Sequence, residues 1–492
     1  MAPLMRYLLV GLAGAVTAWS FYPNHWWAAV LGVALFLFAV DFQSLAKRIT
    51  LAIVFAHSFY AFHVQWVSVL GNDAWFGLVS ITTLPWLFFA VLPINSKSRY
   101  FYFAPAATIV LIEALRASIP WGGFPWGLIA YSQLDGPLVP LATVGGQGLV
   151  TGVVVVVAAT LVKFLKYRKF MGLLIPVVIF AFASNVQPFE SKEAITLSAV
   201  QGNVPRSGLD PETQRLTVLY NHVNVTQELL ADISAGRVAE PDLIVWPESG
   251  TDIDPLRAGV SATQITKLVA KTQIPILIGA TTWDGSSLGE SGAGPRNAGI
   301  LWTAQSGPGQ LYAKNHLVPF GEYIPLRNLI AQYISRFDQI PNDFVPGQTP
   351  GLFNIEGKNV GDVICFEVAY AKHINETIAA GAQVFVVQTN NSTYGITAQP
   401  EQQFAITRFR AIENQRAFLV ASTSGISGLI ANDGSVLAKT KQFESALVTG
   451  EVALISENTT SFRFPNWTIY ASAIIIGLAW RGNRKMSTAL DS

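Results

Sequence analysis

Three polar residues come at the ends of apolar, strand-like runs, and their side chains together could carry out thiol chemistry. They are Glu248, Lys314 and Cys365. A cysteine thiolate is a nucleophile, and its thiol needs a base to remove the proton. Glu248 could act as this base if burial raises the pKa of its carboxylate toward neutrality. Lys314 could hold the cysteine as a thiolate, or stabilise the oxyanion of a tetrahedral intermediate.

Cys365 is the single cysteine among 492 residues. A disulfide framework within the chain is therefore excluded. When only the predicted strand is considered, Cys365 is better interpreted as an inert core thiol, because free cysteine is among the most buried residue types. The convergence of Glu248 and Lys314 on strand ends, where sites form in open α/β sheets, favours the reactive interpretation. His316 is a second candidate base, and we rank it below Glu248 as a loop histidine.

The elements that must position these residues alternate between strands and helices, which is typical of an α/β domain. Strands without intervening helices, as in 276–315, favour hairpins and a sandwich of two sheets. The predicted strands are Ile195–Val200, Leu243–Trp246, Ile276–Ala280, Gly299–Thr303, Leu311–Asn315, Val360–Cys365, Val384–Gln388, Leu419–Thr423, Gly428–Ala431 and Leu447–Glu451. The predicted helices are Glu212–Ile233, Ser261–Lys271, Ala369–Ala380 and Glu401–Gln415.

The composition outside this region is that of a membrane protein. Charged residues make up 13% of the chain, against about 25% in typical soluble domains. Net charge is +1, which gives no indication of nucleic-acid binding. Eight apolar runs approach the length of a membrane span. They are 4–22, 26–41, 49–70, 74–93, 100–116, 138–162, 169–185 and 464–481. The first run could instead be a signal peptide, but a retained span fits the charge pattern better.

Basic residues lie in every second loop, and basic loops stay in the cytoplasm. These residues are Arg6, Lys47, Arg48, Lys97, Arg99, Lys163, Lys166, Arg168, Lys169, Arg481, Arg484 and Lys485. The alternate loops, near His25, near Asp73 and across 120–136, contain no lysine or arginine. Both termini are therefore expected inside, and the α/β domain outside. We expect an N-terminal membrane domain of about seven spans at 1–188, a catalytic domain at 189–456, and a final span with a cytoplasmic tail at 457–492.

The three motifs resemble those of the nitrilase (carbon–nitrogen hydrolase) superfamily. The segments are Trp-Pro-Glu-Ser at Glu248, Lys-Asn-His-Leu at Lys314 and Ile-Cys-Phe-Glu at Cys365. Their order and their positions after strands match the Glu-Lys-Cys triad of that superfamily. The resemblance implies an α-β-β-α sandwich for the extracytoplasmic domain, and it implies no metal or cofactor.

Spans on both sides of such a domain resemble the bacterial apolipoprotein N-acyltransferase family over nearly the full chain. Three segments strengthen the resemblance: His316–Pro325, Gln201–Asn203, and Gly123–Trp126 followed by Tyr131–Gln133. The resemblance implies that a membrane phospholipid gives an acyl chain to Cys365 as a thioester. The amine of the diacylglyceryl-cysteine of an apolipoprotein would then accept the chain. It also implies a multi-pass protein of the bacterial cytoplasmic (inner) membrane.

The resemblance suggests supporting roles for three residues. Glu322 is expected to hold Lys314 or close a loop, and a salt bridge with Arg327 is an even alternative. Glu367 is expected to orient the lysine or its loop, with a purely structural role nearly as favoured. Phe366 is expected to pack, while its backbone N–H could complete the oxyanion hole.

Substrate contacts are expected from Tyr394, Tyr323 and Trp126. Tyr394 takes the place of the Trp-Phe-Gly-like segment that the family often has. The family also often has a tryptophan after Gln-Gly-Asn, and the segment 204–210 contains no aromatic residue. Trp126 and its aromatic neighbours form either a lipid entry path or a plain interfacial belt.

Two other functions compete with this interpretation. A membrane-bound amidase or nitrilase would use water as the final acceptor of the acyl group. Its substrate would be small, and would not require an enzyme with several membrane spans. A transporter or receptor would need functional charges within the spans, and Glu113 is the main candidate. We expect Glu113 to pair with Arg116 at the outer end of its span.

Overall fold

The computed structural model describes residues 2–91, 95–204, 211–251, 253–257, 259–283, 294–334, 337–338 and 340–488. Segment 205–210, where the family often has a tryptophan, lies outside the described residues. The chain divides into two compact units, which are described separately. A helical unit comprises Met1–Gln187, Ile412–Asn414 and Asn458–Ser492, and an α/β unit comprises Pro188–Ala411 and Gln415–Glu457.

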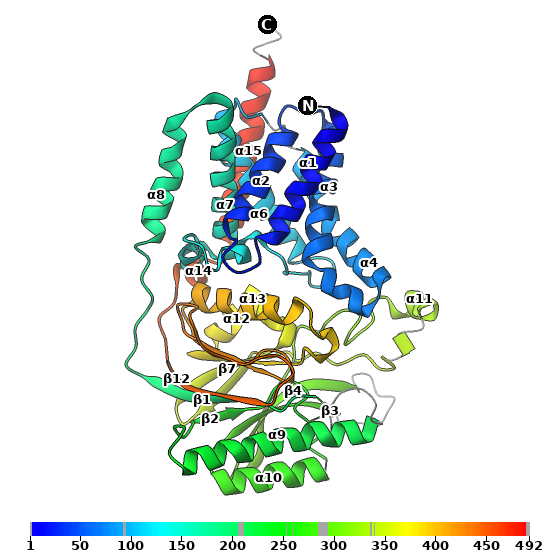
Figure 1. The fold of residues 1–492 in the computed structure, drawn as a ribbon, viewed down its shortest axis with the longest axis vertical. Coiled ribbons are helices and arrows are strands. Elements are labelled where there is room, and N and C mark those ends of the chain that lie inside the picture. Colours follow the sequence, from blue (N-terminus) through cyan, green and yellow to red (C-terminus); the bar gives the residue numbers. More distant parts are fainter. Residues whose placement is uncertain are drawn as a thin grey trace. The chain divides into compact units, whose positions relative to one another are not determined.

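The helical unit consists of α-helices joined by short 3-10 turns (Figure 1). Its helices are α1 (Pro3–Trp19), α2 (Trp27–Val40), α3 (Leu45–His63), α4 (Asn72–Thr83), α5 (Leu87–Val91), α6 (Ala104–Arg116), α7 (Ala142–Tyr167), α8 (Leu174–Ala183), α14 (Thr460–Arg463) and α15 (Trp467–Thr488). Each of the eight apolar runs of the sequence overlaps at least one of these helices. Three stretches are long and apolar enough to cross a membrane, namely Leu45–His63, Asn72–Ala90 and Val139–Tyr167. Shorter apolar helices lie at Pro3–Trp19, Trp27–Val40 and Phe170–Ala183.

The α/β unit contains two six-stranded sheets, with strand orders β12-β1-β2-β3-β4-β5 and β11-β10-β9-β8-β7-β6. The first sheet is built from β1 (Ala194–Gln201), β2 (Leu243–Val245), β3 (Ile276–Trp283), β4 (Pro295–Thr303), β5 (Gly307–Ala313) and β12 (Ala446–Ala453). The second is built from β6 (Gly351–Ile355), β7 (Lys358–Ile364), β8 (Val384–Thr389), β9 (Phe418–Ser422), β10 (Gly428–Ile430) and β11 (Val436–Lys439).

Helices cover the outer faces of this sandwich, α9 (Pro211–Ser234) and α10 (Val260–Thr272) on one side and α12 (Ala371–Ala379) and α13 (Gln399–Asn414) on the other (Figure 1). The parallel strands β7, β8 and β9 lie at the centre of the second sheet. Every residue of β8 is buried, as expected for a parallel strand covered on both faces.

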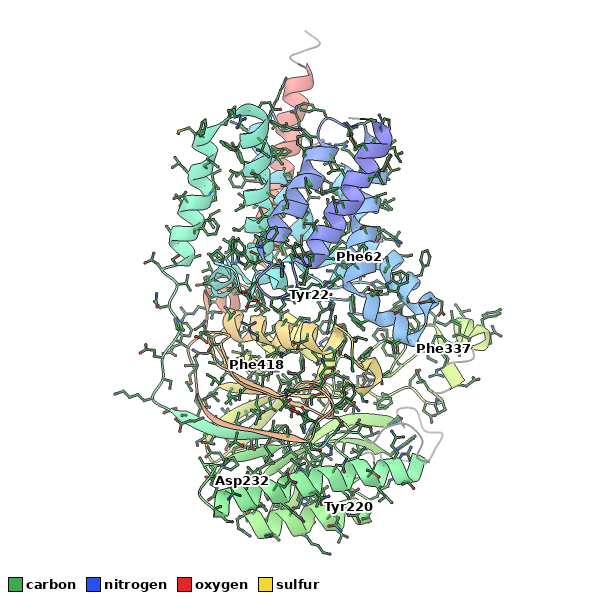
Figure 2. All side chains as sticks on the ribbon, viewed as in Figure 1. Tyr22, Phe62, Tyr220, Asp232, Phe337 and Phe418 are labelled. Atoms are coloured by element: carbon green, nitrogen blue, oxygen red, sulfur yellow. The ribbon has the colours of Figure 1, made fainter. Side chains whose placement is uncertain are left out.

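Apolar side chains on the two faces of each sheet form separate core layers. Leu419 and Val386 point into the core between the sheets. Phe418, labelled in Figure 2, points to the opposite face of β9 and stacks on Phe385 with ring centroids 4.8 Å apart. This alternation follows the two-residue period of a strand. The four-layer α-β-β-α sandwich expected from the sequence is confirmed.

All ten predicted strands and all four predicted helices of this unit are present, with small differences at their ends. Two strands, β6 and β11, were not predicted. Three of the four residues of β11 are exposed and the fourth is half-buried, so its sequence lacks the apolar alternation that signals a strand. Both are terminal strands of the second sheet, where only one neighbour supplies hydrogen bonds.

Candidate active site

The three predicted catalytic residues follow three different strands, two in the first sheet and one in the second. Glu248 lies three residues after β2, Lys314 directly after β5, and Cys365 directly after β7. Because chain segments leave the sheet at these points, their side chains are free of the strand pleat and can turn toward a common site. Glu248 and Lys314 are buried, and Cys365 is partly exposed.

The backbone of Cys365 has a left-handed conformation, with φ of 55°. A non-glycine residue rarely adopts this region, and such residues cluster at functional sites. The sequence predicted that the strand continues through Cys365. Instead, β7 ends at Ile364, and Cys365 begins a 3-10 turn that runs to Ala369. The turn takes the thiol out of the strand register.

Lys314 binds two carboxylates at once. Its Nζ lies 3.3 Å from Glu248 Oε1 and 2.9 Å from Glu322 Oε1. Glu322 Oε2 accepts a further hydrogen bond from the Val318 backbone N–H, at 2.8 Å. Glu322 therefore holds Lys314, as one of the two sequence hypotheses expected. The alternative pairing with Arg327 is wrong, since Arg327 binds Asp343.

Asn297 joins the two carboxylates from the strand between β3 and β5. Its Nδ2 donates to Glu248 Oε1 and also to Glu322 Oε1, the second at 3.0 Å. The backbone carbonyl oxygen of Asn297 accepts a hydrogen bond from the Lys314 backbone N–H at 2.8 Å. The sequence analysis missed this residue, and a buried asparagine within a strand is the signal that could have identified it.

The Glu248 segment is fixed to the second sheet by three hydrogen bonds. The Asn390 backbone N–H donates to Glu248 Oε2 at 2.8 Å, and the Thr423 hydroxyl donates to the Glu248 backbone oxygen at 2.9 Å. Gln388 Nε2 donates to the Trp246 carbonyl at 2.6 Å. These bonds place Oε1 toward Lys314, and so orient the carboxylate of the candidate base.

Glu367 joins the segment that carries Lys314 to the strand that carries Cys365. Its Oε1 accepts from the backbone N–H groups of Asn315 and His316, at 2.7 and 3.0 Å. Its Oε2 accepts from the Ile364 backbone N–H at 2.7 Å and from the Tyr312 hydroxyl at 2.8 Å. Glu367 is fully buried. Glu367 orients the loop after Lys314, as one hypothesis expected. It also links separate segments of the fold, as the structural hypothesis expected.

The charges of the site determine its protonation state. Burial disfavours the Lys314 ammonium, but Glu248 and Glu322 outweigh this effect and raise its pKa well above the ordinary value. Burial raises the pKa of the Cys365 thiol to about 12, and Glu248 adds to the rise while Lys314 opposes it. Lys314 favours the thiolate, as expected, but burial and Glu248 outweigh it, and the raised pKa leaves the resting thiol protonated at neutral pH. The resting pair is a protonated thiol beside a carboxylate, so the proton must move during attack.

His316 is held by aromatic contacts away from this charge cluster. Its ring stacks on Tyr370 with centroids 4.4 Å apart, and it meets His373 edge-on at 5.2 Å. Burial and the neighbouring His373 lower the pKa of His316. Glu248 is better placed than His316 to act as the base. Among the described residues, no group of three or more His, Cys, Asp or Glu side chains is arranged to hold a metal ion.

The aromatic residues proposed to contact substrate have different surroundings. Tyr394 is half-buried; burial raises the pKa of its hydroxyl, and the nearby Cys365 adds to the rise. Tyr323 is half-buried in the loop that begins after Lys314. The Phe366 ring meets Tyr370 edge-on at 5.2 Å. A substrate role for each of them stays a prediction.

Trp126 belongs to the helical unit and is buried there. Its ring is 1% exposed and lies 5.7 Å from the ring of Trp66 and 6.2 Å from that of Phe124. Its carbonyl accepts a hydrogen bond from Arg116 at 2.7 Å. Its predicted role in substrate binding stays a prediction.

Glu113 and Arg116 each bind the loop that contains Trp126. The Glu113 carboxylate accepts from the Ile129 backbone N–H and the Thr151 hydroxyl, each at 2.7 Å. Arg116 donates to the carbonyls of Phe124, Trp126 and Gly127 at 2.7 to 3.3 Å. Within the described part of the chain, each side chain binds these partners and forms no salt bridge with the other, so the expected ion pair is wrong.

Comparison with known proteins divides the chain in the same two parts. Residues 13–160 match the model of the apolipoprotein N-acyltransferase N-terminal domain, and residues 197–460 match the model of carbon-nitrogen hydrolases. An apolipoprotein N-acyltransferase from Mycolicibacterium smegmatis is 32% identical, over 96% of this chain and 84% of the relative. One from Vibrio cholerae is 23% identical, over 98% of both chains.

Some solved structures are similar to about half of this chain. An amidase from Nesterenkonia sp. is 17% identical, covers 52% of this chain and 89% of its own, and has a TM-score of 0.38. Nit3 from Saccharomyces cerevisiae, a member of the nitrilase superfamily, is 16% identical over 54% of this chain and 92% of its own, with a TM-score of 0.39.

Proposed function

The chain belongs to the apolipoprotein N-acyltransferase family, and from this premise we propose that Cys365 carries the transferred acyl chain as a thioester. The donor is a membrane phospholipid, and the acceptor is the amine of a diacylglyceryl-cysteine at the start of an apolipoprotein. The observation that carries the proposal is the buried contact of Lys314 with Glu248, since the charges of both act on the Cys365 thiol. A nucleophile divides this difficult ester-to-amide exchange into two steps.

In the first step, the Cys365 sulfur attacks the carbonyl carbon of a phospholipid ester while Glu248 takes the thiol proton. The resulting oxyanion lies near the Lys314 ammonium and the backbone N–H of Phe366, which stabilise its charge. When the intermediate collapses, the ester C–O bond breaks. The lysophospholipid oxygen takes the proton from Glu248, and the thioester remains. The raised pKa of Cys365 makes this transfer necessary, because the free thiolate is scarce at neutral pH.

In the second step, the acceptor amine attacks the thioester carbonyl and forms the amide bond. Glu248 takes a proton from the amine, and the C–S bond breaks. The departing sulfur is protonated from Glu248, which restores the resting site. Lys314 keeps its proton throughout, since both carboxylates raise its pKa. Its role is electrostatic, and that of Glu248 is to transfer protons.

Both substrates are lipids, which explains why the catalytic unit is joined to apolar helices. We place the α/β unit on the extracytoplasmic face of the bacterial cytoplasmic membrane, because the basic loops lie on the opposite side. Tyr394 and Tyr323 are proposed to contact the acyl chain or headgroup near Cys365. Trp126 is proposed to act through the loop in which it is buried.

The test is the intact mass of the purified protein after incubation with one defined phosphatidylethanolamine, before and after neutral hydroxylamine. We expect an adduct of one acyl chain that hydroxylamine removes and that Cys365→Ala abolishes. A diacylglyceryl peptide with a free amine should then discharge the adduct and gain the same mass. Discharge by water at the same rate, with no acylated peptide, would contradict the proposal and favour an amidase.

A further inference from the structure

The strand next to the nucleophile carries a threonine at the level of Cys365. Strand β8 pairs in parallel with β7, and Ile364 lies opposite Gln388. Cys365 and Thr389 come directly after this pair, Cys365 as the first residue of the 3-10 turn and Thr389 as the last residue of β8. The Thr389 side chain hydrogen-bonds to Cys365 and is 2% exposed.

The other partner of the Thr389 hydroxyl is Gln403, on helix α13. Gln403 Nε2 lies 3.0 Å from Thr389 Oγ1. An amide nitrogen can only donate, so this bond uses a lone pair of the hydroxyl oxygen. A hydroxyl has one proton, and the remaining partner is the Cys365 sulfur. Thr389 therefore donates to the sulfur rather than accepting from it.

A chain of buried hydrogen bonds fixes this direction. The Gly425 backbone N–H, which can only donate, lies 2.9 Å from Ser422 Oγ. The Ser422 hydroxyl in turn donates to Asn391 Oδ1 at 3.2 Å. This sets the orientation of the Asn391 amide, whose Nδ2 donates to Gln403 Oε1 at 2.7 Å.

The same logic orients the Gln403 amide. Its Oε1 also accepts from Gln399 Nε2, at 3.2 Å, so its Nε2 must be the atom that faces Thr389. Gln399 and Gln403 are both nearly fully buried. Bonds aligned donor to acceptor in a buried chain polarise one another, which strengthens the last one. Here the last bond ends on the nucleophile.

We propose that Thr389 is a catalytic residue that donates a hydrogen bond to the Cys365 sulfur, and that Gln403 is a positioning residue that orients its hydroxyl. The bond strengthens as negative charge develops on the sulfur during attack, and again as the sulfur leaves the thioester. Thr389 keeps its proton, and the thiol proton still passes to Glu248. The role in acyl transfer rests on the proposed function, whereas the effect on the thiol does not.

The neighbours of the sulfur act on it in opposite senses. Glu248 and Glu322, held by the first sheet and the loop after it, disfavour negative charge on Cys365. Lys314 and Thr389 favour it, and Thr389 is the contribution of the second sheet. Removing the Thr389 hydroxyl while keeping its shape should therefore make the thiol harder to ionise.

The experiment uses the alkylation of Cys365 by iodoacetamide as a function of pH, in the full-length protein in detergent. The chain has one cysteine, so each added carbamidomethyl mass reports on Cys365 alone. We expect Thr389→Val to lower the alkylation rate at pH 9 about tenfold, and Thr389→Ser to restore it to within about twofold. Gln403→Met should lower the rate by a smaller factor.

Thr407→Val is the matched control. Thr407 is fully buried on the same helix as Gln403, and its hydroxyl donates to the Gln403 backbone oxygen at 3.0 Å. We expect the wild-type pH profile for this variant. A wild-type profile for a folded Thr389→Val protein would overturn the proposal. So would an equal loss in Thr389→Ser, since that variant retains the donor.

Alkylation needs neither lipid nor acceptor, so this result stands apart from the acyl-transfer test. If the Thr389 variants behave as expected but no acyl adduct forms on the wild-type protein, the hydrogen bond is upheld and the lipid donor is rejected. If the acyl adduct forms at the wild-type rate in Thr389→Val, the hydroxyl has no catalytic role.

Discussion

Two buried charged clusters among the described residues, one from each unit, are built in different ways. In the α/β unit, the Lys314 ammonium binds the carboxylates of Glu248 and Glu322 directly. In the helical unit, Glu113 and Arg116 are close in sequence, yet each binds backbone or hydroxyl groups of its surroundings. The first cluster gathers titratable groups around a nucleophile, and the second determines the shape of a loop.

The partners of the charged groups distinguish a candidate reactive cluster from a structural one. A charge that is bound by backbone N–H or C=O groups has partners that cannot exchange protons with it. Charges that face one another and a thiol shift the pKa of that thiol, which marks a candidate functional site. Burial alone does not separate the two cases, because Glu113 and Glu248 are 5% and 7% exposed.

The largest effect is expected from Glu248→Gln, which removes the base while keeping the shape. Acyl-enzyme formation should slow by about 10²–10⁴-fold in single turnover, followed by intact mass. Alkylation of Cys365 at pH 9 should not fall, because the Glu248 charge raises the thiol pKa. A parallel loss of both rates would show that Glu248 acts through the fold rather than as a base.

Arg116→Met should break the structural cluster in the other unit. Three carbonyls of the loop 124–127 lose their donor, and Glu113 loses the nearby positive charge, so we expect destabilisation of roughly 3–5 kcal/mol. The readout is the thermal unfolding midpoint in detergent. Arg99→Met is the control, since Arg99 is exposed. The pH profile of Cys365 alkylation should be unchanged in the folded fraction of Arg116→Met, and a shifted profile would mean that the two clusters are coupled.

Glu367→Gln tests a carboxylate that is structural although it lies within the active-site region. In the wild-type protein, four donors bind the two carboxylate oxygens of Glu367. A glutamine offers them only one oxygen, so we expect the free energy of unfolding to fall by roughly 3 kcal/mol. Glu376→Gln is the matched control, because Glu376 forms an exposed pair with Lys372. Equal unfolding midpoints for the two variants would contradict the structural role of Glu367.

The smallest effect is expected from Glu322→Gln. Glu322 is one of the groups that raise the pKa of Cys365, so its neutralisation should lower that pKa from about 12. Half-maximal alkylation then moves to lower pH, and the rate at pH 9 rises. Asp343→Asn should leave the profile unchanged, since Asp343 pairs with Arg327. A shift of the midpoint to higher pH in Glu322→Gln would mean that the loss of Lys314 positioning dominates.

Much of the α/β fold could be predicted, because its central strands are runs of apolar residues. A strand such as Val384–Thr389, buried on both faces, is apolar at nearly every position and is bounded by polar residues. The edge strand β11 lacks this signal, because three of its four residues are exposed, and Val436–Lys439 was therefore not predicted. The three candidate catalytic residues could be identified because each directly follows, or lies near, such an apolar run.

The contacts that surround the trio could not be predicted, because they join residues far apart in the chain. Asn297 reaches Glu248 across 49 positions, and Thr423 reaches the Glu248 backbone across 175. The sequence analysis singled out Glu113 and Arg116, which are close on one helix, but the pairing expected from this proximity is wrong. Whether two nearby charges pair depends on which backbone groups the fold brings to them.

The sequence was enough to predict the division into an apolar helical part and an α/β part, the positions of the central strands along the chain, and the residues able to do thiol chemistry. Hydrophobic periodicity and side-chain chemistry are local properties, so they can be followed along the chain. The tertiary structure decided that Glu322 binds Lys314 rather than Arg327, and that the resting thiol is protonated. It also placed Thr389 beside Cys365. Those outcomes depend on strand register and on the sum of charges within a few ångströms, which only the folded chain brings together.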